Sequence, residues 1–138
     1  MRMLLLTAIL LFSGLSGSSV RSQSTNKDLL VSPRLTRLRR DVEAGNRSAL
    51  ESFWQDIAKQ GAPLVESIQG EERNLLVTFL WRSKEAANVV IMCDFGANVR
   101  SRILTRLGST DVWYKIYRMP NDARFLYQLS VDDPSFPF

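Results

Sequence analysis

The spacing of the apolar residues changes once along the chain, close to Pro63. Before this point, apolar residues recur every three or four positions, which is the spacing of a helix with one buried face. After it, apolar and polar residues alternate in short runs, which is the spacing of half-buried strands. The chain has 138 residues, enough for one hydrophobic core. The change therefore predicts a single mainly β domain that is preceded by two short α-helices.

The two helices have recognisable ends. The first is expected to begin at Ser32, a capping residue followed by proline, and to stop at Gly45. The second is expected to begin near Asn46, or at Ser48 with Glu51 completing a capping box, and to end at Gly61 and Pro63. The apolar residues of the second helix lie on one face, which is expected to pack on the core rather than bind a cofactor. They are Leu50, Phe53, Trp54 and Ile57.

Short strands with turns between them are expected to fill the rest of the chain. Residues 88–94 are apolar on both faces, so they are expected to form a central strand. Residues 100–107 are a weaker candidate, expected at a sheet edge. The other candidates are residues 64–69, residues 74–82 and the two strands on either side of residues 119–122. About five to seven short strands of this kind predict an antiparallel β-sandwich.

Several aromatic side chains lie close together in the second half of the chain. In the last strand, Phe125 and Tyr127 share a face with the apolar residues that follow at every second position, so they are expected in the core. In the strand before it, Trp113 and Tyr117 share a face with the charged Lys115. Such a mixed face is expected to be covered only in part, by another element or domain. Trp113 and Tyr117 are therefore predicted to contact a ligand.

Two arginines complete the set of ligand-binding candidates. Arg82 is the last residue of one strand candidate, and Arg124 lies at the start of the last one. A guanidinium group pairs well with the oxygens of an anionic ligand. The alternative for both residues is a solvated position at the end of a strand.

The chain lacks the residues of common catalytic sites. It contains no histidine, so a Ser-His-Asp triad is excluded, and it has no G-x-S-x-G or phosphate-binding glycine motif. Cys93 lies in an apolar run and is expected to be a core residue. The adjacent carboxylates of Asp132 and Asp133 suit a turn better than acid–base chemistry. We expect no catalytic residue, no metal and no cofactor, and a net charge of +4 is too small to indicate nucleic-acid binding.

The first residues have the pattern of a secretory signal peptide. Arg2 precedes an apolar run from Leu4 to Leu15, and small polar residues follow. Cleavage is expected after about Ser22, and the alternative is a buried core helix. Export to the periplasm or out of the cell is therefore expected, without membrane attachment once the leader is removed.

Several short segments between Ser32 and Pro134 carry a resemblance to a known family. In order, they are SPRLTRL, ALESFW, GAPLVE, LLVTFLWR, GSTDVWY and ARFLYQL. Taken together, they resemble the N-terminal domain of the enterochelin (enterobactin) esterases and their exported relatives. The resemblance implies an immunoglobulin-like early-set β-sandwich, followed in the family by an α/β-hydrolase that cleaves the esters of a ferric catecholate siderophore. The family's best-known members are cytoplasmic. Because this chain has a leader, another ester or a carbohydrate ester remains open as the substrate.

With this resemblance, the chain divides into five expected parts. They are a signal peptide (1–22), a linker (23–31), a helical lead-in (32–62), an immunoglobulin-like esterase N-terminal domain (63–133) and the start of an interdomain connector (134–138).

Three hypotheses of function follow. The first is a non-catalytic accessory domain that supports substrate binding by an α/β-hydrolase domain, with a role in iron acquisition. The second is a free-standing exported module that binds a glycan or an aromatic ligand through Trp113 and Tyr117. The third is a truncated product with no independent role. A hydrolase encoded in the downstream reading frame would favour the first.

The signal peptide gives a first testable prediction. Mass spectrometry of the mature protein from its native host should find an N-terminus between about Ser18 and Ser24. An intact Met1 on protein recovered from the soluble cytoplasm would contradict it.

Overall fold

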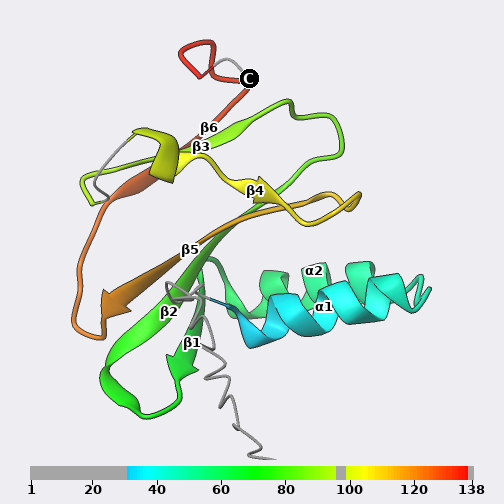
Figure 1. The fold of residues 1–138 in the computed structure, drawn as a ribbon, viewed down its shortest axis with the longest axis horizontal. Coiled ribbons are helices and arrows are strands. Elements are labelled where there is room, and N and C mark those ends of the chain that lie inside the picture. Colours follow the sequence, from blue (N-terminus) through cyan, green and yellow to red (C-terminus); the bar gives the residue numbers. More distant parts are fainter. Residues whose placement is uncertain (1–30, 96–98, 137–138) are drawn as a thin grey trace, which may run out of the picture.

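The computed structural model describes residues 31–95 and 99–136, so the expected signal peptide and nearly all of the linker lie outside the described residues. Two helices and two antiparallel sheets make up the fold. Figure 1 shows both helices on the same side of the larger sheet, and the smaller sheet apart from them. None of the described helices is long and apolar enough to cross a bilayer.

Helix α1 (Pro33–Glu43) is fastened at its first residue. The Ser32 hydroxyl oxygen accepts a hydrogen bond from the backbone N–H of Leu35 at 3.2 Å, as the sequence predicts. The same hydroxyl donates to the carboxylate of Glu66 at 2.5 Å, and the backbone N–H of Arg34 donates to that carboxylate at 3.0 Å. One buried serine therefore caps the helix and joins it to the first strand.

Helix α2 (Ala49–Gln60) begins differently from the capping box considered above. Ser48 has helical backbone angles and its side chain makes no capping hydrogen bond. The side-chain oxygen of Asn46 instead accepts from both the backbone N–H and the hydroxyl of Ser48, at 3.1 and 2.9 Å. The chain leaves α1 through Gly45 and α2 through Gly61, both with positive φ, as expected for helix stops.

The larger sheet has the strand order β1-β2-β5-β4. Its strands are β1 (Leu64–Ile68), β2 (Glu71–Arg82), β5 (Val112–Pro120) and the two-residue β4 (Thr105–Arg106). Strands β2 and β5 pair over nine residues, from Asn74 with Pro120 to Arg82 with Val112. This long antiparallel pair is the centre of the fold.

The smaller sheet pairs β3 (Val89–Cys93) with β6 (Tyr127–Val131). The segment predicted to be a central strand therefore has a full neighbouring strand on one side, and only the single bridge from Val90 to Ile103 on the other. Val89, Val90 and Ile91 are nevertheless fully buried. The weak edge candidate at residues 100–107 begins within a 3₁₀ helix, η1 (Val99–Arg102), and contains only the two-residue strand β4.

Both faces of the β2–β5 pair are buried. Leu80 and Val112 belong to a helix-facing core with the apolar residues of α1 and α2. Phe79 and Trp113 belong to an inter-sheet core with residues of β3 and β6. The alternation predicted for β5 is confirmed. The expected surface position of Trp113 is wrong, because the second sheet covers that face and leaves Trp113 only 8% exposed.

Phe79 lies at the centre of the inter-sheet core and is 1% exposed. Its ring centroid is 4.6 to 5.9 Å from those of four rings on other segments, which are Phe95, Tyr117, Phe125 and Tyr127. Tyr127, predicted as a core residue, faces this cluster but is 38% exposed, because it is the first residue of the small sheet's outer strand. Its burial is therefore shallower than expected.

The position of Phe79 predicts a large loss of stability on truncation. Phe79→Ala should lower the free energy of unfolding by about 3–5 kcal/mol, since a buried ring is lost and a cavity remains. Val65→Ala, at a 53% exposed position of β1, is the control and should change it by less than about 0.5 kcal/mol. Denaturant titration measures both. Equal losses would contradict the assignment of Phe79 to the core.

Candidate functional site

The four residues predicted to contact a ligand do not converge on one site. Trp113 and Tyr117 lie in the inter-sheet core, and Arg82 lies on the opposite face of the same sheet, beside α2. Arg124 is exposed between β5 and β6, and it forms no ion pair with any described residue. Each of the four residues has its own set of contacts.

Tyr117 has its polar end engaged inside the protein. Its hydroxyl donates to the backbone carbonyl of Ser101 at 3.0 Å. Its ring meets those of Phe79 and Phe95 edge-on, with centroids 5.9 and 5.1 Å away. Burial raises the pKa of Tyr117 to about 12, so the hydroxyl stays protonated and remains a donor at neutral pH. These contacts tie the 3₁₀ helix η1 to β5.

Trp113 also holds loops together. Its indole N–H donates to the backbone carbonyl of Ser83 at 3.1 Å, and the guanidinium of Arg106 lies 5.8 Å from its ring centroid. Arg106 in turn donates to the backbone carbonyls of Thr110 and Lys84, at 2.7 and 3.1 Å. The contacts of Trp113 in this structure therefore fix the loop after β2 against the start of β5.

Arg82 belongs to a four-residue group that we call the Arg82 junction: Glu51, Trp54, Arg82 and Asp111. The guanidinium of Arg82 pairs with Asp111 at 2.8 Å and with Glu51 at 2.9 Å. It also lies 5.5 Å from the ring centroid of Trp54, whose indole N–H donates to Asp111 at 3.0 Å. Both carboxylate oxygens of the buried Asp111 are thus occupied. The junction joins α2 to the ends of β2 and β5.

The charged forms of Asp111 and Arg82 in the Arg82 junction are stabilised by their neighbours. Burial alone would raise the pKa of Asp111, but the hydrogen bonds from Trp54 and Arg82 and the charge of Arg82 outweigh it and lower the pKa below 3.8. The hydrogen bonds to Asp111 and Glu51 raise the pKa of Arg82. Neither group is poised to exchange a proton near neutral pH, so the arrangement suits a structural ion pair better than acid–base catalysis.

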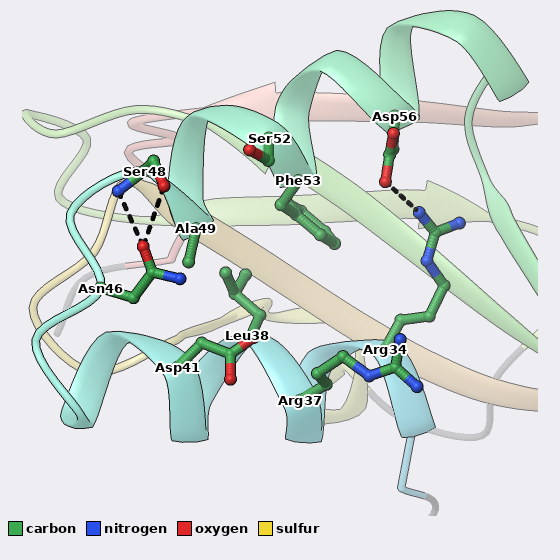
Figure 2. Close-up of a pocket in the computed structure, with 10 residues that line it drawn as sticks. All are labelled: Arg34, Arg37, Leu38, Asp41, Asn46, Ser48, Ala49, Ser52, Phe53 and Asp56. Carbon is green, nitrogen blue, oxygen red and sulfur yellow. Dashed lines mark hydrogen bonds and ion pairs between the residues drawn. The ribbon is translucent and has the colours of Figure 1, made fainter.

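The space between the two helices forms a groove of about 260 Å³ that the sequence did not reveal. Figure 2 shows this inter-helix groove, with α1 on one side and α2 on the other. Its apolar lining residues are Leu38, Ala49 and Phe53. Its polar lining residues are Arg34, Arg37, Asp41, Asn46, Ser48, Ser52 and Asp56. Two of its lining residues, Asn46 and Ser48, carry a sequence signal, but that signal predicts a helix start and not a groove.

The described residues offer little for a metal or a nucleophile. No group of three or more Asp, Glu or Cys side chains within residues 31–95 and 99–136 is placed to hold a metal ion. The thiol of Cys93 donates to the backbone carbonyl of Phe95 at 2.8 Å and packs against the inter-sheet core. Among the described residues, this thiol is therefore engaged in packing.

Comparison with known proteins finds a family match for part of the chain. Residues 76–137 match the family described as "Enterochelin esterase, N-terminal". The iron(III) enterobactin esterase of Yersinia enterocolitica is 35% identical over 105 residues, which are 69% of this chain and 28% of that protein. The iron(III) salmochelin esterase of Escherichia coli O6:H1 is 30% identical over 87 residues, which are 60% of this chain and 21% of that protein.

The resemblance to the N-terminal domain of enterochelin esterases is thereby confirmed. The chain spans less than a third of the length of either relative. No solved structure matches it.

Three of the segments that carry this resemblance meet at the Arg82 junction. ALESFW supplies Trp54, LLVTFLWR supplies Arg82 and GSTDVWY supplies Asp111. These segments are far apart in the sequence, and the hydrogen bonds of Asp111 bring them together. The structure therefore gives Trp54, Arg82 and Asp111 a role in joining the helices to the sheet.

The Arg82 junction predicts a specific dependence of stability on pH. Because the pKa of Asp111 is lowered in the folded protein, its charge stabilises the fold fully above its ordinary pKa of 3.8, and this contribution is lost as the pH falls through the lower folded value. Asp111→Asn should therefore be less stable than the wild type at neutral pH, by about 1–3 kcal/mol. The difference should shrink below about pH 4.

Urea titrations at several pH values measure this difference. Asp122→Asn, at an exposed turn position, is the matched control and should follow the wild type throughout. A stability difference for Asp111→Asn that stays constant down to pH 2 would contradict the role assigned to the charge.

Proposed function

We propose that this chain is the non-catalytic N-terminal part of an exported esterase, in which an α/β-hydrolase domain follows in the same polypeptide. The observation that carries the proposal is the family match, together with two relatives that are both named as esterases. The absence of histidine from all 138 residues supports it, since a Ser-His-Asp triad would have to come from elsewhere.

The proposed substrate is an ester of a ferric siderophore, with a role in iron acquisition. The printed names of the relatives support this class, because one acts on iron(III) enterobactin and the other on iron(III) salmochelin. The predicted leader supports export, to the periplasm or out of the cell. We further propose that the two sheets form an immunoglobulin-like early-set sandwich. The antiparallel pairing and the shared inter-sheet core support that fold.

The end of the described chain supports a connector that leaves in a fixed direction. The Asp132 carboxylate accepts from the backbone N–H groups of Ala87 and Asn88, at 2.7 and 3.3 Å. The side chain of Asn88, which is 5% exposed, donates to the carbonyls of Asp133 and Phe136 and accepts from the N–H of Asp133. Residues 132–136 are thus bound to the start of β3, as the base of a connector should be.

A free-standing binding module is the second candidate function. The contacts of Trp113 and Tyr117 do not favour this function, because Trp113 is buried and the Tyr117 hydroxyl is engaged within the protein. The inter-helix groove favours it instead, since its polar side chains line a solvent-open hollow.

Catalytic assays separate an accessory domain from an enzyme. The chain without its leader should hydrolyse neither ferric enterobactin nor a simple aryl ester above the uncatalysed rate. The same chain joined to the protein encoded downstream should hydrolyse one of them, with the nucleophile in the added part. Saturable turnover by the chain alone, abolished by one of its own substitutions, would contradict the proposal.

A further inference from the structure

We propose that the inter-helix groove is a binding site for a neutral polyhydroxylated ring, such as a pyranose sugar. The proposal goes beyond the esterase assignment and does not depend on it, because every residue involved lies in α1, α2 or the loop between them. It rests on three observations: the lining of the groove, the fixed orientation of one amide and the balance of charge.

The lining of the groove combines an apolar surface with hydrogen-bonding groups of different kinds. Ala49 and Phe53 of α2, with Leu38 of α1, provide carbon surface. A carboxylate (Asp41), an amide (Asn46), a hydroxyl (Ser52) and a guanidinium (Arg37) surround them. A pyranose has the complementary arrangement, with C–H groups on its face and hydroxyls around its edge. A volume of about 260 Å³ is sufficient for one such ring.

The side-chain amide of Asn46 is held in one orientation. Its oxygen accepts both the backbone N–H and the hydroxyl of Ser48, at 3.1 and 2.9 Å, and flipping the amide would lose the bond from the backbone N–H, which can only donate. The NH₂ group is therefore on the other side, and Figure 2 shows it directed toward the space between the helices. No described residue accepts a hydrogen bond from it. The groove thus contains a donor that is oriented before any ligand arrives.

The Asp41 carboxylate is the complementary acceptor. It is partly buried on α1 and receives no hydrogen bond or ion pair from the described residues. A carboxylate can accept two hydroxyl protons, and an amide NH₂ can donate to the oxygen of a neighbouring hydroxyl. Vicinal hydroxyl groups are both donors and acceptors, so they fit a site that presents Asp41 and Asn46 together.

The balance of charge favours a neutral ligand. The groove is lined by two arginines and two aspartates. Arg34 is already paired with Asp56 at 3.4 Å and donates to Gln60, so these charges are satisfied within the protein. An anion placed in the groove would meet Asp41, and a cation would meet Arg37. The opposite charges of Arg37 and Asp41 therefore give the groove no net preference for either ion, whereas a polyhydroxylated ring can use both groups as hydrogen-bonding partners.

Saturation-transfer NMR on the full chain, produced in a bacterium, tests the proposal. The probes are methyl β-D-glucopyranoside, methyl α-D-mannopyranoside and methyl β-D-galactopyranoside, with sodium glucuronate as the charged comparison. At least one neutral glycoside should bind saturably with a Kd of about 1 mM, the affinity expected for a single ring in an open groove. Glucuronate should bind more weakly than the matching neutral sugar.

Two substitutions locate the site without removing the fold. Asn46→Asp keeps an oxygen for Ser48 but replaces the donor with an acceptor, and Asp41→Asn removes the charge of the acceptor at nearly constant size. Each should weaken binding about tenfold or more, since each removes a hydrogen bond to the ring. Asp122→Asn, far from the groove, should bind like the wild type. Thermal melts confirm that all three variants are folded.

Four outcomes would overturn the proposal. They are signals that grow linearly with concentration without saturating, glucuronate as the only ligand, binding that both groove variants retain, and equal weakening by Asp122→Asn. None of these outcomes bears on the esterase assignment, which the hydrolysis assays test separately.

Discussion

The burial of both faces of the β2–β5 pair is the constraint on which the rest of the structure depends. Helices cover one face and the β3–β6 sheet covers the other, so alternate residues of β5 enter two separate cores. The rings of Trp113 and Tyr117 therefore pack in the inter-sheet core, and their polar atoms donate hydrogen bonds to backbone carbonyls. Trp113 and Tyr117 are therefore committed to contacts within the protein, whereas Trp81 and Tyr127 each remain 38% exposed.

Polar contacts at the margins of the helix-side face hold the two helices on the sheet. Asp111 links α2 to the sheet through Trp54 and Arg82, and Glu66 links the first turn of α1 to β1 through Ser32. Both carboxylates accept from more than one donor, which offsets the free-energy cost of their burial. The helices are thus joined to the sheet at both margins, and the inter-helix groove lies between two elements packed on the same core.

Some polar side chains of the described residues are paired within the protein and others are not. Three of the segments that carry the resemblance meet at the Arg82 junction, where each side chain is already paired. The last described residues are held to the start of β3 through Asn88. The inter-helix groove, by contrast, contains the NH₂ of Asn46 and the carboxylate of Asp41. The paired groups and the groove thus lie in different parts of the domain.

The sequence by itself determined the local structure, because caps, stops and alternation depend on neighbouring residues. Ser32 capped the first helix, Gly45 and Gly61 ended the helices, and the faces of β5 followed from its alternation. Tertiary structure decided what covers each face, since that depends on residues distant in the chain. The second sheet buries Trp113 and leaves Tyr127 partly exposed, and the fold brings Arg82 next to Asp111. It also created the inter-helix groove, which exists only because two helices lie side by side over one core.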